Sequence, residues 1–139
     1  MTRVREIMTE VPVTVGMQTS LHAAARKMRD ADIGDVLVTD DGRVYGMLTD
    51  RDLVVRGLAE GLDPDQTSVH AVCSTDVIGV GPDEPVRTAV ETMREKAVRR
   101  LPVLDEARQV IGVVSLGDLA IERDPSSALA DISAAQGNT

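Results

Sequence analysis

The stretch GMLTDRD at residues 46–52 is followed, 66 residues further along the chain, by GVVSLGD at residues 112–118. Both stretches contain a glycine, two apolar residues, a Ser or Thr, two variable positions and an Asp. A hydroxyl residue followed three places later by an acid is typical of a helix capping box. Each stretch therefore predicts a strand that passes directly into a helix.

The duplication extends over most of the chain. Val4 matches Val69 and Met28 matches Met93 at an offset of 65 residues, and one inserted residue near Ala107 moves the offset to 66. A fixed register with a single shift indicates a duplicated structural unit. We predict four segments: a first repeat at 4–60, a linker at 61–68, a second repeat at 69–123 and a C-terminal tail at 124–139.

Each repeat predicts the order strand, helix, strand, strand, helix. The expected strands are 11–15, 35–39 and 44–48 in the first repeat and 77–80, 101–104 and 109–114 in the second. A helix is expected to begin at Thr19 or Ser20 and to end near Gly34, and the second helices begin at Thr49 and Ser115. A helical crossover favours a parallel first pair of strands, and the following hairpin adds an antiparallel pair. The expected fold class is α+β (α/β-like), with two βαββα repeats packed about a pseudo-twofold axis.

Composition excludes several classes of protein. The chain has 139 residues, a net charge of −8, no Phe, no Trp and one Tyr. An acidic chain with a single aromatic side chain is a poor match for nucleic acid. We expect no membrane segment, no secretory signal and, because Cys73 is the single cysteine, no intrachain disulfide. These features predict a cytoplasmic protein.

The sequence offers little for catalysis. His22 and His70 have no partner at metal-ligand spacing, and Cys73 aligns with Met8, which favours a packed apolar role. We therefore expect no enzyme, no catalytic residue, no metal and no required cofactor. The Ser/Thr–Asp pairs admit two interpretations: a helix cap alone, or a cap whose carboxylate also accepts hydrogen bonds from a ribose diol.

The repeated stretch, together with VREIMT at 4–9 and VRRLPV at 98–103, resembles a tandem pair of CBS (cystathionine β-synthase) domains, a Bateman module. The chain is similar to small stand-alone two-CBS proteins of the bacterial hypoxic-response type, which implies a role in a stress response. The resemblance implies two clefts between the repeats that bind AMP, ADP, ATP or S-adenosylmethionine. It also implies a homodimer that acts in signal transduction, as a non-catalytic regulator of a protein partner in trans. The alternative is a structural or oligomerisation protein with vestigial clefts.

The resemblance also implies a set of ligand-binding residues. Asp52 and Asp118 would bind ribose, with Thr49 and Ser115 beside them. The other candidates are expected to line the base pocket or contact phosphate, although for the arginines a solvated surface role is equally open: Thr14, Val15, Gly79, Val80, Pro102, Arg51, Arg99 and Arg100.

The two copies are not equal. Arg100 of the second repeat aligns with Asp35 of the first, and Pro102 aligns with Leu37. One cleft should therefore be richer in positive charge than the other. We predict at most one strong nucleotide site per chain.

Overall fold

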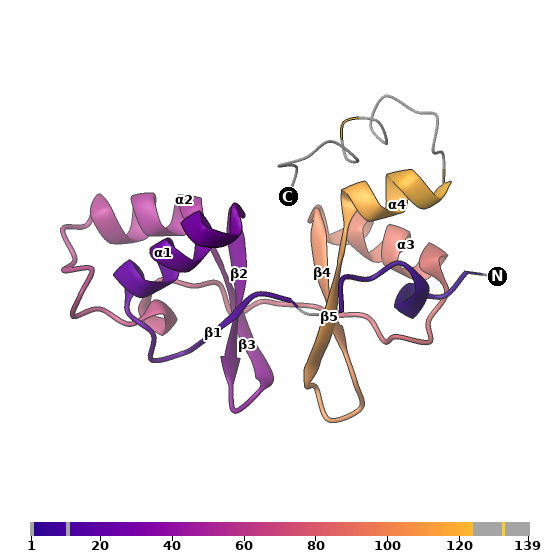
Figure 1. Cartoon of the computed structure of the whole chain (residues 1–139), viewed down its shortest axis with the longest axis horizontal. Helices are drawn as coiled ribbons and strands as arrows, with labels where there is room; N and C mark the ends of the chain where they lie inside the picture. Colours follow the sequence, from indigo (N-terminus) through magenta and orange to yellow (C-terminus); the bar gives the residue numbers. More distant parts are fainter. Residues whose placement is uncertain (1, 11, 124–131, 133–139) are drawn as a thin grey trace. The chain divides into compact units, whose positions relative to one another are not determined.

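The computed structural model describes residues 2–10, 12–123 and 132, so the expected tail at 124–139 lies outside the described residues except for Ile132. The chain divides into two compact units (Figure 1). The first unit contains residues 13–77, and the second unit contains residues 1–12 with 78–139.

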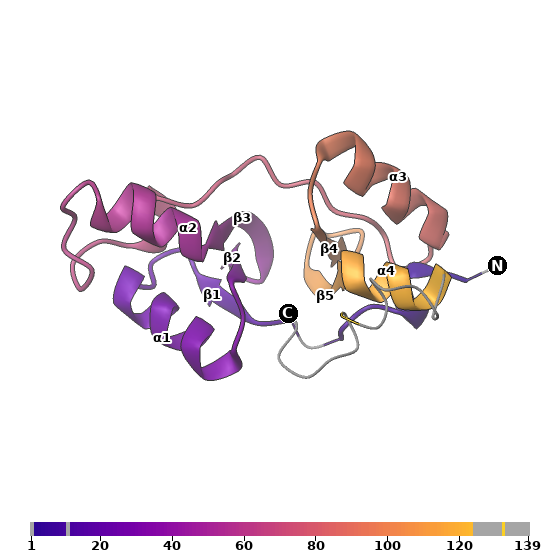
Figure 2. The same ribbon diagram turned by 90° about the horizontal axis from the view of Figure 1, so that it is seen from above.

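The first unit is a three-stranded sheet with helices. Strand β1 (Thr14–Gly16) pairs in parallel with β2 (Asp35–Asp40), which pairs antiparallel with β3 (Arg43–Thr49). Helix α1 (Leu21–Ala31) makes the crossover between β1 and β2 (Figures 1 and 2). The mixed pairing confirms the predicted crossover and hairpin.

The second helix of the first unit changes its geometry after one turn. Helix α2 (Asp50–Asp52) continues as the π-helical segment η2 (Leu53–Leu58). The Ala59 N–H donates to the Val54 carbonyl, five residues back, at 2.8 Å. Such π-turns are rare and often lie at functional sites.

Local chemistry sets the limits of α1. The Ser20 hydroxyl oxygen accepts a hydrogen bond from the Ala23 N–H at 3.0 Å, so Ser20 is the N-cap. The helix ends at Asp32, whose φ is 55°, and the expected end near Gly34 is two residues late. Asp visits this left-handed conformation more readily than most residues, so glycine is not needed there.

The second unit contains a two-stranded antiparallel sheet. Its elements are α3 (Val86–Lys96), β4 (Arg100–Leu104), β5 (Val110–Ser115) and α4 (Leu116–Arg123). The expected strand at 77–80 is wrong, because only Val80 makes a bridge there, in parallel with Val103. A Cβ added at Gly79 would lie 2.7 Å from the Leu104 Cδ1, and glycines weaken a strand ladder.

The two compact units do not coincide with the two sequence repeats. The short 3₁₀ turn η1 (Val4–Glu6) belongs to the second unit, and its counterpart η3 (Val69–Ala71) belongs to the first. We call residues 2–9 and 67–74 the docking segments. Each completes the core of a unit otherwise built from the other repeat, and Val4 and Val69 are fully buried there. The predicted segments 4–60 and 69–123 therefore describe how the sequence is duplicated, and they do not describe which residues pack into one compact unit.

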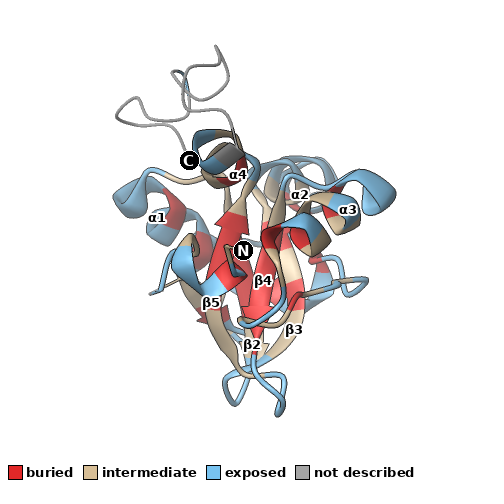
Figure 3. Ribbon diagram, turned by 90° about the vertical axis from the view of Figure 1, so that its right-hand side faces the viewer, coloured by how far each residue is buried: buried red, intermediate tan, exposed pale blue. Residues whose placement is uncertain are grey.

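Both docking segments use the same backbone contacts. The Leu21 N–H donates to the Thr67 carbonyl, and the Val86 N–H donates to the Thr2 carbonyl, each at 3.0 Å. Further along, Ser74 bridges to Met47 of β3 just as Thr9 bridges to Val113 of β5. Figure 3 shows buried residues in red along the strands and on parts of the helices, and exposed residues in pale blue on the outer faces of the helices.

Two glycines allow the docking segments to approach the sheet. A Cβ at Gly46 would lie 2.5 Å from the Ser74 carbonyl oxygen, and one at Gly112 would lie 2.9 Å from the Thr9 carbonyl oxygen. Real Cβ atoms do not approach backbone oxygens this closely. The glycine that begins each repeated stretch is therefore a packing residue.

Candidate functional site

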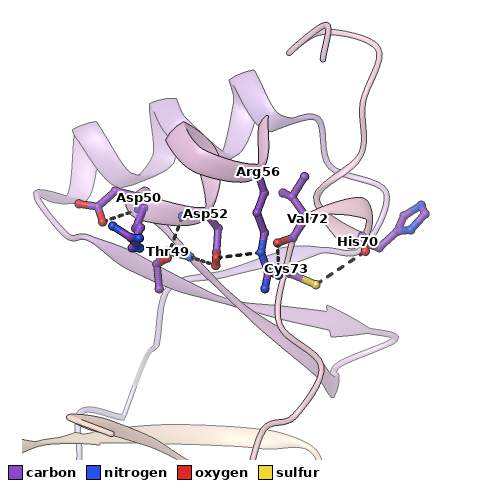
Figure 4. A network of polar contacts seen from close by, with 8 residues as sticks. Thr49, Asp50, Asp52, Arg56, His70, Val72 and Cys73 are labelled. Atoms are coloured by element: carbon purple, nitrogen blue, oxygen red, sulfur yellow. Dashed lines mark hydrogen bonds and ion pairs between the residues drawn. The ribbon is translucent and has the colours of Figure 1, made fainter. Parts of the chain in front are cut away.

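The Thr49–Asp52 pair forms a reciprocal capping box at the start of α2 (Figure 4). The Thr49 hydroxyl oxygen accepts from the Asp52 N–H at 3.0 Å, and the Asp52 Oδ2 accepts from the Thr49 N–H at 2.9 Å. Both side chains are therefore fixed by the backbone that they cap.

The Ser115–Asp118 pair repeats this arrangement at the start of α4. The Asp118 Oδ2 accepts from the Ser115 N–H at 2.9 Å, and the Ser115 hydroxyl oxygen accepts from the Asp118 N–H at 3.1 Å. Both pairs are thus helix caps, which both interpretations require, and the ribose contact stays a prediction. A carboxylate has about four acceptor positions, so one capping bond leaves each acid able to accept further hydrogen bonds.

The strands place further candidates at the same end of the first sheet. Asp35, at the start of β2, lies opposite Thr49, and Thr14 lies opposite Leu37, two residues further along β2. The Lys27 ammonium donates to the Thr14 carbonyl at 2.8 Å. The first unit therefore brings Thr14, Thr49 and Asp52 to one end of the sheet, and only their ligand role stays a prediction.

The second unit has the same register with different side chains. Arg100 lies opposite Ser115, in the position that Asp35 has in the first unit. The Leu116 N–H donates to the Arg99 carbonyl at 2.7 Å, just as the Asp50 N–H donates to the Gly34 carbonyl. The difference in charge predicted from the sequence is thus located at equivalent points of two equivalent hairpins.

Three of the expected pocket residues are buried. Val15 and Val80 belong to the apolar cores with exposed fractions of 5% and 4%, and Pro102 is below 2%. Val15 lies in β1 and Pro102 in β4, whereas Val80 makes only an isolated bridge with Val103, and a role of all three in a base pocket stays a prediction. Arg51 and Arg99 are exposed and Arg100 is half-buried, and a phosphate contact by these arginines stays a prediction.

Arg56 was missed by the sequence analysis. Its Nε lies 3.9 Å from the Asp52 Oδ1, and its Nη1 donates to the Val72 carbonyl at 3.1 Å (Figure 4). The contact with Asp52 could have been predicted from the sequence, because an Arg four residues after an Asp on a helix can pair with it. The contact with Val72 depends on the docking segment and has no local signal.

The other candidate reactive side chains are those of two histidines and one cysteine. The His22 Nδ1 pairs with Asp65 at 2.8 Å on the surface. No group of three or more His, Cys, Asp or Glu side chains that could hold a metal ion occurs in the part of the chain that the structure describes. Cys73 is buried in the first core, and this burial raises the pKa of its thiol, as expected for a packing residue. No helix within the described ranges is long and apolar enough to cross a bilayer.

Comparison with known families gives a match in both repeats. A family model described as "CBS domain" matches residues 4–57 and 69–123. Hypoxic response protein 1 of Mycobacterium tuberculosis (strain ATCC 25618 / H37Rv) is 40% identical over 121 residues, which are 86% of this chain and 84% of that protein. The CBS domain-containing protein YhcV of Bacillus subtilis is 36% identical over 137 residues, 96% of each chain.

Solved structures agree with this fold. The crystal structure of Hypoxic Response Protein I with two coordinated zinc ions has a TM-score of 0.79 and 38% identity over 88% of this chain and 99% of that one. The CBS domain protein PAE2072 from Pyrobaculum aerophilum, complexed with AMP, has a TM-score of 0.78 and 26% identity over 94% and 99%. The CBS domain pair of protein MJ0100, in complex with 5'-methylthioadenosine and S-adenosyl-L-methionine, has a TM-score of 0.74 and 26% identity over 86% and 97%.

The crystal structure of Hypoxic Response Protein I holds two coordinated zinc ions. A zinc site is built by three or four side chains, and the described residues of this chain contain no such group. We therefore assign no zinc site to them.

Proposed function

The chain belongs to the CBS-domain family, and on that premise we propose that it is a non-catalytic regulatory protein that binds an adenosine-type ligand. The ligand is AMP, ADP, ATP or S-adenosylmethionine. It binds at the capping-box acids Asp52 and Asp118. The observation that carries this proposal is the reciprocal capping box, built in both units with the same distances to within 0.1 Å.

The capping box suits a ribose for a physical reason. The backbone N–H holds one carboxylate oxygen in place, so the acid is oriented before a ligand arrives and loses little side-chain entropy on binding. Asp52 has an exposed side-chain fraction of only 17%, which strengthens a hydrogen bond that it accepts. Two solved relatives in complex with AMP, or with 5'-methylthioadenosine and S-adenosyl-L-methionine, support the choice of ligand class.

The two sites are expected to differ in affinity. Asp35 lies beside the cap of the first unit and Arg100 beside the cap of the second. A phosphate is repelled by the first residue and attracted by the second, so we propose one strong nucleotide site per chain.

We propose that the protein transmits ligand binding to other molecules through contacts with a protein surface. Apolar side chains are exposed on η2, with Val54 at 55% and Leu58 at 75%, and such side chains favour association with another protein surface. We propose a homodimer that signals to a partner in trans.

A structural protein without a ligand is the second candidate. It is favoured by the observation that Thr49, Asp52, Ser115 and Asp118 are already satisfied as helix caps. In that case the repeated motif maintains the fold and the protein acts through its surface.

A thermal-shift screen with AMP, ATP and S-adenosylmethionine distinguishes the two candidates. Asp52→Asn and Asp118→Asn keep one oxygen for the cap and remove the charge, and Asp30→Asn on the exposed face of α1 is the matched control. A ligand at 100 times its Kd stabilises the folded protein by about 2.7 kcal/mol. A shift that is lost in one cap variant and kept in Asp30→Asn supports ligand sensing, whereas no shift with any of the three ligands favours the structural role.

A further inference from the structure

We infer that Arg56 couples ligand binding at Asp52 to the docking segment at 67–74, because its side chain contacts both the Asp52 carboxylate and the Val72 carbonyl. The inference rests on the proposed function, since it takes Asp52 as the ligand acid. Arg56 is then a positioning residue that acts through Asp52.

One guanidinium makes both contacts. The Arg56 Nε lies 3.9 Å from the Asp52 Oδ1, while Nη1 donates to the Val72 carbonyl at 3.1 Å (Figure 4). The Asp52 Oδ2 is held by the Thr49 N–H, so the two oxygens of the carboxylate face two different groups. A planar guanidinium with five donors can serve an acid and a carbonyl at once, which an ammonium group does less well.

The contact with Val72 lies close to where the docking segment meets the sheet. Val72 is 2% exposed, and two residues later Ser74 exchanges two backbone hydrogen bonds with Met47 of β3, at 2.8 and 2.9 Å. The chain leaves the first unit after Val77. A change at Asp52 is therefore connected, through Arg56, to the last part of this unit before the chain continues into the other.

The second unit is built differently at this point. Four residues after Asp118 the chain carries Glu122, which accepts a hydrogen bond from the Thr2 hydroxyl at 2.9 Å. Glu122 has the same sign of charge as Asp118 and does not attract it. The contact between α4 and the docking segment at 2–9 is thus made without the capping acid.

The consequence is a linkage between ligand and docking segment. Arg56 favours one orientation of the Asp52 carboxylate, and a ribose diol that binds to this orientation stabilises the same arrangement. By reciprocity, the ligand must then tighten the Arg56–Val72 contact as much as that contact improves ligand affinity. A ligand bound at Asp118 does not stabilise the docking segment at 2–9 in this way, because the capping acid makes no contact with that segment through Glu122.

The test uses the full-length protein with adenosine as the probe, which carries the diol and no phosphate. Calorimetry gives the affinity, and amide hydrogen exchange followed by NMR reports on Met47 and Ser74, with Ala24 in α1 as the reference amide. The variants are Arg56→Ala, the milder Arg56→Gln and, as the matched control in the second unit, Glu122→Ala.

We expect saturating adenosine to slow exchange at Met47 and Ser74 relative to Ala24 in the wild-type protein and in Glu122→Ala. Both Arg56 variants should bind adenosine about threefold to fivefold more weakly, the scale of one partly exposed ion pair, and should lose the slowing at saturation. Wild-type affinity and undiminished slowing in both Arg56 variants would overturn the inference while leaving the proposed function intact. Failure of the wild-type protein to bind adenosine, AMP or S-adenosylmethionine would overturn the proposed function itself, and with it the role of Arg56.

Discussion

Gly46→Ala is expected to destabilise the first unit by about 1–3 kcal/mol. The new Cβ would lie 2.5 Å from the Ser74 carbonyl oxygen and 2.9 Å from the Cys73 Sγ. If the docking segment holds its place, the cost is that of inserting a methyl group into a packed core, about 1–3 kcal/mol. If the segment moves away, the two hydrogen bonds between Met47 and Ser74 are lost, at about 0.5–1.5 kcal/mol each. Both routes lead to the same range.

Urea denaturation monitored by circular dichroism measures this loss. The matched control is Gly16→Ala in β1, where the added Cβ would meet only the Thr19 Oγ1 at 3.9 Å, an ordinary contact. Gly16→Ala should stay within about 0.5 kcal/mol of the wild-type protein. A Gly46→Ala protein as stable as the Gly16→Ala protein would refute the docking of residues 67–74 against β3.

Three further predictions concern individual side chains. Val69→Ala should lower the free energy of unfolding by about 2 kcal/mol, because two buried methyl groups are worth about 1.6 kcal/mol before any cavity forms. Val54→Ala, on the exposed side of η2, should cost little. Equal losses of the two variants in urea denaturation would contradict this prediction. The Arg5 side chain lowers the pKa of Asp83 through a 2.8 Å hydrogen bond, so Arg5→Ala should raise the pKa of Asp83 in an NMR titration. The small stabilisation that this pair gives is present above the ordinary Asp pKa and is lost as the pH falls through the lowered pKa of Asp83. Burial raises the pKa of the Cys73 thiol, so a disulfide reagent at pH 8 should modify this thiol slowly in the folded protein and quickly in urea. Rapid modification without urea would show that Cys73 is not a core residue.

The parts of the fold predicted correctly are those fixed by local chemistry. The Thr49 and Ser115 caps depend on residues three positions apart, and the two hairpins depend on short turns, so both are visible in the sequence. The parallel pairing of β1 with β2 follows from the helical crossover between them.

The parts that were missed depend on contacts distant in sequence. Nothing near Val4 indicates that it packs among residues of the second repeat, about 80 positions away. The π-turn of η2 accompanies close packing of Gly57, whose added Cβ would lie 3.1 Å from the Leu21 Cδ1. Such a contact appears only when the helices are placed together.

The candidate site was predicted in its centre and not in its surroundings. Asp52 and Asp118 were identified because the repetition of a cap in the same register is unusual. Arg56 was overlooked because half of its role depends on the Val72 carbonyl, which the docking segment brings to it. Its counterpart Glu122 shows that the repeats diverge around a common pair of acids.

Calorimetric titration of the full-length protein with AMP tests whether the capping-box acids bind a nucleotide. We predict saturable binding with about one strong site per chain, abolished by Asp118→Asn, whose cap lies beside Arg100, and largely kept in Asp52→Asn and Asp30→Asn. Absence of AMP binding, or binding that survives both cap variants, would contradict the claim that the repeated capping-box acids are ligand sites.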